Sequence, residues 1–320
     1  MTKRVPIVIV TGPTGVGKSD HSYVIAQRYR GQVINADSGQ FLTPLTIGTG
    51  KPDWRSKPIA HYLFDIIDEP RKLTVWEYRE RVLELIEKIG SQGKIPVIVG
   101  GSLFYIKSLL FPPKAVVPSD AAWPTDVPEE QLWPLLNSYD PVRAAALSRK
   151  DVYRLRRALA IKASTGINPS ELVPTCDPPG PFFLLGMTRA RQDLEPIIIN
   201  RVTSMIERGW LDEIDLLAGT GWEQFAREHN IIGYKTLFDY RSGPQTEKDF
   251  ARAMLEIIHT TRDYSRRQMT FWRGLERQIN EAYAQNNEQL PRARVVTWDA
   301  SREPRHEHMR LLEQFLREVS

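Results

Sequence analysis

The sequence predicts an α/β fold, in which helices flank a parallel sheet that carries a phosphate-binding loop, with a helical insertion domain. Three observations support this prediction. Apolar runs rich in β-branched residues alternate with segments whose apolar residues recur at helical spacing. Residues 5–19 read VPIVIVTGPTGVGKS, in which such a run leads directly into a glycine-rich loop. A proline-rich stretch that begins near residue 111 then separates the first part of this pattern from the rest.

The composition is that of a globular protein of one or two domains, since 41% of the 320 residues are hydrophobic and 26% are charged. No apolar run approaches the length of a membrane span, and the first residues enter a strand too directly for a signal peptide. We therefore expect a cytoplasmic protein with no membrane partner. Cys176 is the only cysteine, which excludes an intramolecular disulfide and a cysteine-cluster zinc site. The net charge of +4 permits a nucleic-acid partner without requiring one.

The glycine-rich loop fits the phosphate-binding pattern at each fixed position, which Gly12, Gly17, Lys18 and Ser19 occupy. The glycines allow a tight loop whose N–H groups point at an anion, and the following helix directs its positive end at the same place. Lys18 adds a charge, and the Ser19 hydroxyl can ligate Mg²⁺. The loop predicts a site for a diphosphate or triphosphate and does not choose between them.

The other elements follow from the same two periodicities. Predicted strands lie at 5–11, 32–36, 95–99, 182–187 and 294–298, with a further strand or buried connection at 61–68. Predicted helices lie at 19–30, 73–89, 140–165, 194–217 with a break near Gly209, 251–273 and 306–318, and more helix follows 230–235.

The second strand ends at Asp37, beside the loop already assigned to phosphate. Ligands of open α/β sheets bind outside the carboxyl ends of the strands, so this carboxylate lies where chemistry is expected. A carboxylate near a bound phosphate is repelled unless it serves a metal ion or a proton transfer. The alternative is that Asp37 only caps a turn.

The third strand closes on Gly100, Gly101 and Ser102, where phosphate-loop hydrolases usually have an acidic residue that holds Mg²⁺. The nearest acidic candidates are Asp37 and Asp65. This weakens an ATPase or kinase interpretation without excluding it.

Two predicted helices are basic. The helix at 140–165 carries seven arginine and lysine residues, which form either a solvated face or a surface for a polyanion. In the helix at 251–273, arginines alternate with Phe271 and Trp272, a pattern that suits phosphate contacts and stacking on RNA bases. The alternative for this second helix is a core helix with ion pairs.

Several stretches together resemble the bacterial-type tRNA dimethylallyltransferases, which prenylate an adenine beside the anticodon. They are GPTGVGKS (12–19), NADSGQ (35–40), IGTGKP (47–52), VGGSLFY (99–105), RLRRALAIKASTG (154–166), IIGYK (231–235) and TTRDYSRRQMTFWRG (260–274). The last stretch is the most specific, because unrelated proteins share the phosphate loop. Where the family has tyrosine and then arginine-glycine after the aspartate, this chain has Leu42, Thr43 and Pro44.

The resemblance implies roles for individual residues. Asp37 would accept a proton from the adenine amine, and Ser102 would orient the site. The diphosphate of dimethylallyl diphosphate would be held by Gly12, Thr14, Gly15, Val16, Gly17, Lys18, Ser19 and Lys235, with Mg²⁺ on Ser19. The anticodon stem-loop of tRNA would meet Asp37, Ser38, Gly39, Gln40, Arg154, Arg157, Gln268 and Arg273.

The resemblance also implies a division into a core at 1–118, a helical insertion that binds tRNA at 119–177, and a core continuation at 178–320 with C-terminal helices. We expect a monomer. Three alternative functions stay open: an AMP-type prenyltransferase of free nucleotides, an ATP-dependent phosphotransferase, and a nucleotide switch or RNA-binding module without enzymatic activity. The stretch 260–274 argues against the first, and Asp37 argues against the last.

Overall fold

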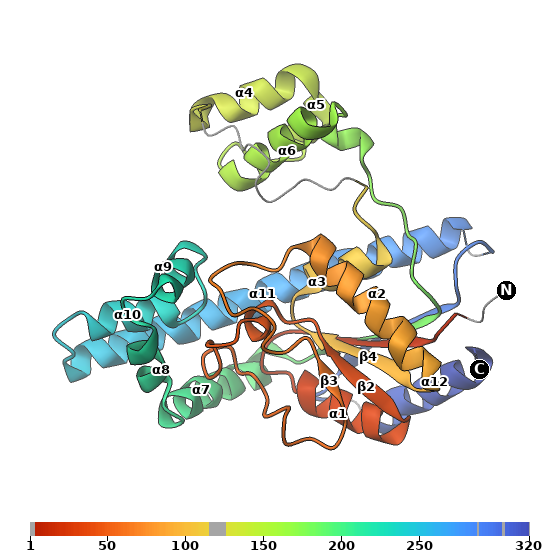
Figure 1. Cartoon of the computed structure of the whole chain (residues 1–320), viewed down its shortest axis with the longest axis horizontal. Helices are drawn as coiled ribbons and strands as arrows, with labels where there is room; N and C mark the ends of the chain where they lie inside the picture. Colours follow the sequence, from red (N-terminus) through yellow and green to blue (C-terminus); the bar gives the residue numbers. More distant parts are fainter. Residues whose placement is uncertain (1–3, 115–125, 287, 303–304, 320) are drawn as a thin grey trace. The chain divides into compact units, whose positions relative to one another are not determined.

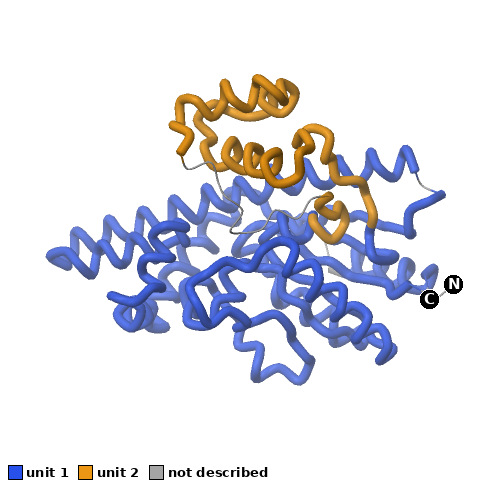
Figure 2. The backbone as a smooth tube through the Cα atoms, turned by 45° about the horizontal axis from the view of Figure 1, so that its top comes forward, with its two compact units in different colours: residues 1–107, 178–320 blue, residues 108–177 orange. Residues whose placement is uncertain are grey.

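The computed structural model in Figure 1 describes residues 4–114, 126–286, 288–302 and 305–319. The chain divides into two compact units, residues 1–107 with 178–320 and residues 108–177 (Figure 2). The larger unit holds the sheet, and the smaller unit is helical.

The larger unit is built on one parallel sheet of six strands in the order β3-β2-β4-β1-β5-β6. The strands are β1 (Ile7–Thr11), β2 (Gly31–Asn35), β3 (His61–Tyr62), β4 (Ile95–Gly100), β5 (Phe182–Thr188) and β6 (Ala293–Asp299). The three central strands β4, β1 and β5 are apolar on both faces, as expected for strands covered on both sides. This architecture confirms the predicted fold class.

Helices cover both faces of the sheet (Figure 1). On one face, Val8 and Val10 of β1 pack in one cluster with α1 (Lys18–Arg28) and α12 (Arg305–Val319). On the other face lie α2 (Val75–Ser91) and the forty-residue α11 (Glu247–Asn286). The Trp272 side chain of α11 is 1% exposed and packs against β5. The phosphate loop connects β1 to α1, and both of these elements are packed in this core.

Further helices of this unit lie near the carboxyl ends of the strands or connect them. They are α3 (Leu103–Leu110), which crosses into the second unit, α7 (Arg191–Glu207), α8 (Trp210–Leu217), α9 (Gly221–Glu228) and α10 (Tyr234–Arg241). The predicted break near Gly209 is confirmed, since Gly209 has a φ of 93° and separates α7 from α8. In the part of the chain that the structure describes, no helix combines the length and apolarity that a membrane span requires.

In the larger unit, two predicted elements have other bounds in the structure. Within 61–68, only His61 and Tyr62 form a strand, because Leu63 and Asp65 adopt positive φ angles of 61° and 51° that end the extended backbone. The helix predicted at 251–273 extends from Glu247 to Asn286. Beyond Arg273 its apolar stripe continues through the buried Leu275 and Ile279.

The smaller unit, Ser108–Asp177, has its own core. Its helices are α4 (Glu129–Tyr139), α5 (Pro141–Ala145) and α6 (Val152–Thr165). Leu132 and Leu136 of α4 pack against Leu155 and Leu159 of α6. The predicted start of the insertion at residue 119 lies outside the described residues.

The two ends of the smaller unit lie next to each other. The Asp177 N–H donates to the Leu110 carbonyl at 2.9 Å, so the two ends of the unit are hydrogen-bonded to each other. The single helix predicted at 140–165 is wrong: two helices form there, because the Asp151 side chain accepts from the Arg154 N–H and starts α6 anew.

We expect Gly186→Ala to destabilise the fold. A Cβ at Gly186 would lie 2.0 Å from the Trp272 ring, so the buried indole must shift. Overpacking of this kind costs about 1–3 kcal/mol in the free energy of unfolding, measurable by urea denaturation. Gly274→Ala is the control, because a Cβ in that helical position meets nothing within 4 Å and alanine favours the helix. Equal stability of Gly186→Ala and the parent protein would contradict the close packing of α11.

Candidate active site

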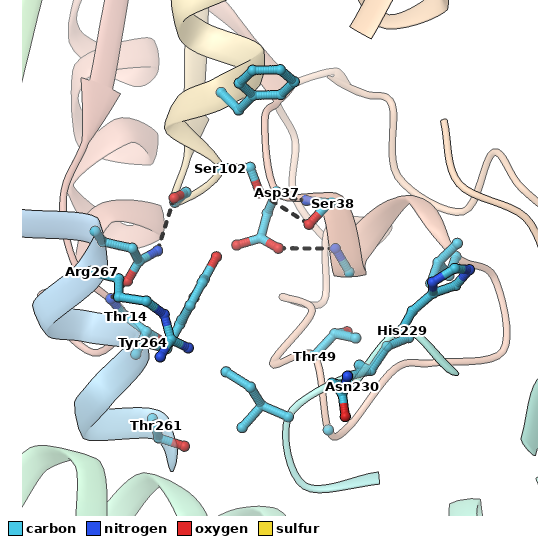
Figure 3. Close-up of a pocket in the computed structure, with 18 of the residues that line it drawn as sticks. Thr14, Asp37, Ser38, Thr49, Ser102, His229, Asn230, Thr261, Tyr264 and Arg267 are labelled. Atoms are coloured by element: carbon cyan, nitrogen blue, oxygen red, sulfur yellow. Dashed lines mark hydrogen bonds between the residues drawn. The ribbon is translucent and has the colours of Figure 1, made fainter. Parts of the chain in front are cut away.

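A cavity of about 710 Å³ opens at the carboxyl ends of the strands. Asp37 after β2, Thr14 after β1 and Ser102 after β4 line it together with residues of α7 and α11. Figure 3 shows the Asp37 carboxylate pointing into the cavity, with Tyr264 and Arg267 on one side and Thr49, His229 and Asn230 across from them. The cavity therefore lies where an open parallel sheet is expected to bind a ligand.

Asp37 is held by the turn that follows β2. Its N–H donates to Asn35 Oδ1 at 3.0 Å, and its Oδ1 accepts from the Gly39 N–H at 3.2 Å. Burial raises the pKa of Asp37, while Lys18, the Gly39 N–H and Arg201 act in the opposite direction. A carboxylate in this environment accepts a proton more readily than one in water. The predicted placement of Asp37 beside the phosphate loop is what the structure shows.

Ser102 joins the turns that follow β2 and β4. Its Oγ accepts from the Ser38 N–H at 2.9 Å and donates to Ser38 Oγ at 3.1 Å. The Ser102 N–H donates to the Ala36 carbonyl at 3.2 Å. Both serines line the cavity, so the hydroxyl pair fixes one wall beside Asp37.

The phosphate loop ends at Gly17, which has a φ of 93°. Lys18 follows it as the first residue of α1. The Lys18 ammonium donates to the Pro13 carbonyl at 2.8 Å, and burial lowers the pKa of Lys18 to about 8 against the opposing charge of Asp37. Ser19 is exposed in the first turn of α1. Thr14 is the loop residue that lines the cavity.

Gln268 lies inside the site. Its side chain is 6% exposed, its Oε1 accepts from the Thr14 N–H at 2.9 Å, and its Nε2 donates to the Gly101 carbonyl at 2.9 Å. The amide thus joins α11 to the ends of β1 and β4. Gln268 also lines the cavity, and both ends of its amide are occupied by main-chain groups. Its contact with tRNA stays a prediction.

Three other residues singled out in the sequence lie elsewhere than the cavity lining. Lys235 is exposed on α10. Gln40 is buried and donates to the Gly50 carbonyl at 3.3 Å, so it supports a neighbouring loop. Asp65 pairs with Lys51 and with Arg55, which removes it as a candidate for holding a metal ion.

The other residues assigned to tRNA fall into two groups, one in each unit. Arg273 is exposed on α11 in the larger unit, and Gly39 and Ser38 line the cavity of that unit. Arg154 and Arg157 belong to α6 of the smaller unit, where Arg154 is 3.5 Å from Asp151.

Sequence reasoning missed Arg201 and Tyr264, both of which line the cavity. Burial lowers the pKa of Arg201, and the nearby Asp37 charge opposes this shift. Burial also raises the pKa of Tyr264. Arg201 is an isolated basic residue in the middle of α7, so no local pattern distinguishes it. Tyr264 lies within the stretch 260–274, where the sequence pattern marks only Phe271 and Trp272 as candidates for stacking.

The sequence matches the IPP transferase family over residues 40–275. It is 32% identical to the tRNA dimethylallyltransferase of Thermotoga neapolitana over 280 residues, covering 85% of this chain and 91% of the relative. It is 34% identical to tRNA dimethylallyltransferase 1 of Citrifermentans bemidjiense over 287 residues, covering 87% and 92%. The chain belongs to this family. It is accordingly a transferase.

A solved structure of a eukaryotic dimethylallyltransferase acting on tRNA shares the fold, with a TM-score of 0.79 at 23% identity over 98% of this chain and 80% of that one. Leu42 and Thr43 follow the turn that carries Asp37. The Leu42 side chain is 4% exposed and lines the cavity, and Thr43 Oγ1 donates to Asp68 Oδ1 at 2.5 Å. Leu42 therefore contributes an apolar side chain to the wall of the cavity.

We expect Asp37→Asn to stabilise the ligand-free protein at neutral pH. The folded-state pKa of Asp37 lies above the value of about 3.9 in an unfolded chain. Ionisation therefore costs stability as pH rises from that value through the folded-state pKa, and asparagine removes the cost. Melting temperatures from pH 4 to 8 should show a gain that grows with pH. Asp53→Asn, at an exposed position, is the control. A lower melting temperature for Asp37→Asn at pH 7 would contradict the burial argument.

Proposed function

We propose that this chain transfers a dimethylallyl group from dimethylallyl diphosphate to the N6 amine of the adenine that follows the anticodon of tRNA. The observation that carries the proposal is the Asp37 carboxylate, held in a cavity at the strand ends beside the phosphate loop. The activities named for the relatives support it. In the reaction, the amine nitrogen bonds to the allylic carbon, and the carbon–oxygen bond to the diphosphate breaks.

Asp37 is the proton acceptor in this proposal. The attacking amine must lose a proton, and a half-buried carboxylate with a raised pKa is suited to take it. The Ser102 and Ser38 hydroxyls lie on the same wall of the cavity and can orient the adenine ring through hydrogen bonds. The diphosphate leaves with the electron pair of the broken bond.

The leaving diphosphate needs positive groups. Lys18 and Arg201 both interact with the Asp37 charge, so two cationic side chains lie near the carboxylate. The first three N–H groups of α1 have no carbonyl one turn earlier in the helix to bond, so they are available to an anion. Such donors stabilise negative charge as it develops. The role of Lys235 at the diphosphate stays a prediction.

Mg²⁺ is the metal ion that we propose, with the exposed Ser19 hydroxyl as the protein ligand. Among the residues that the structure describes, no three His, Cys, Asp or Glu side chains form a metal-binding group. Mg²⁺ commonly keeps several waters and binds through substrate phosphates, which fits a site with one protein hydroxyl. When bound, it would neutralise charge on the diphosphate. Cytoplasmic location and a monomeric state stay predictions.

We expect Asp37→Asn to lower the single-turnover rate by about 10²–10⁴-fold with a much smaller change in tRNA affinity. Asparagine keeps the shape and removes the proton acceptor. The assay uses labelled dimethylallyl diphosphate with tRNA, with AMP, or with no acceptor. A near-parental rate would refute the role of base, and rescue by added Mg²⁺ would indicate a metal ligand instead. Transfer to AMP rather than to tRNA would refute the proposed acceptor.

We also expect tRNA binding to weaken with salt, with α11 contributing to the slope. Arg273→Ala and Arg266→Ala remove exposed charges, so each should reduce the slope of log K against log salt by about 1. Arg262→Ala should change the slope less, because the Arg262 side chain is 25% exposed, against 78% for Arg266, and pairs with Glu195 at 2.9 Å. Arg28→Ala, on α1 and paired with Glu313, is the control. Unchanged slopes for Arg266→Ala and Arg273→Ala would show that α11 is structural only.

A further inference from the structure

We infer that Glu213 of α8 is a positioning residue for the transfer reaction. It holds the loop 46–50 that forms one wall of the cavity and supports the turn carrying Asp37. The inference rests on the proposed function of Asp37. Glu213 is remote from the phosphate loop in the sequence and belongs to none of the motifs recognised there.

The Glu213 carboxylate is 8% exposed and accepts four hydrogen bonds. One oxygen accepts from the N–H groups of Thr46 and Ile47 at 2.8 and 2.7 Å. The other accepts from the Gly48 N–H at 3.2 Å and from the Tyr234 hydroxyl at 2.6 Å. Three consecutive N–H groups converge on one buried carboxylate, so this side chain determines the course of the loop.

The loop 46–50 also packs against Trp210 of α8. A Cβ at Gly48 would lie 2.3 Å from Trp210 Nε1, and Trp210 is 1% exposed. Trp210 is three residues before Glu213 in the same helix, so one turn of α8 supplies both the packing surface and the hydrogen-bond acceptor. The loop cannot move toward α8 without displacing this indole.

The loop in turn contacts the Asp37 turn. Gly48 and Thr49 line the cavity. Thr49 Cγ2 lies 2.9 Å from where a Cβ of Gly39 would be, so the loop packs closely against Gly39. The Gly39 N–H is the donor to Asp37 Oδ1. A displaced loop therefore withdraws support from the hydrogen bond that orients the carboxylate.

Glu213→Gln is the test, because glutamine keeps the size of the side chain and directs an NH₂ group at N–H or O–H donors. We expect the single-turnover rate to fall about 10–100-fold, the loss typical of a small misplacement of catalytic groups. The acidic limb of the pH–rate profile should move to higher pH, because the Gly39 N–H, together with Lys18 and Arg201, lowers the pKa of Asp37 against the effect of burial. A role confined to stability would leave that limb in place.

The control is Asp215→Asn on the same helix, where the exposed carboxylate pairs with Arg241 away from the loop. It should leave the rate and the limb unchanged. Tyr234→Phe removes one of the four hydrogen bonds and should move both readouts in the same direction by less; it replaces Glu213→Gln if that variant does not fold. A folded Glu213→Gln with a parental rate and limb would overturn the inference. Failure of the parent protein to prenylate tRNA would instead refute the proposed function.

Discussion

The site depends on the two hydrogen bonds of the Gln268 amide. One side chain of α11 accepts from the first turn of the phosphate loop and donates to the carbonyl that follows β4. Because an amide presents a donor and an acceptor in one plane, it satisfies two buried main-chain groups that would otherwise be costly to leave unpaired. These two hydrogen bonds therefore join α11 to the loops that follow β1 and β4.

Burial at Asp37 and Lys18 shifts two opposite charges toward neutrality. It raises the pKa of the carboxyl and lowers that of the ammonium, while each charge favours the ionised form of the other. Such a pair is a poor source of stability, because the free-energy cost of taking its charges out of water is larger than it is for a pair on the surface. The same feature makes the carboxylate responsive to a ligand that brings charge next to it. Stability and reactivity are therefore opposed at this position.

The strands and the phosphate loop could be predicted from sequence because their signals are local: β-branched runs, glycine spacing and an acidic residue at a strand end. The end of the strand at Tyr62 could not, since it follows from the positive φ of Leu63 and Asp65, which their residue types disfavour. Gln268 looks like a surface residue in an arginine-rich helix, and only the sheet beneath α11 makes it a buried link. Glu213 likewise acquires its role from a loop more than 160 residues away.

The smaller unit meets the rest of the chain through two segments that are already tied together. The hydrogen bond between Asp177 and Leu110 brings its entry and exit next to each other, and its leucine core is its own. The insertion therefore acts on the larger unit as a short closed loop, whatever its length. The entropic cost of bringing its two ends together is offset by contacts within the smaller unit. An inserted domain of this kind can lengthen, shorten or change its surface over evolution without altering the register of the sheet that carries the chemistry.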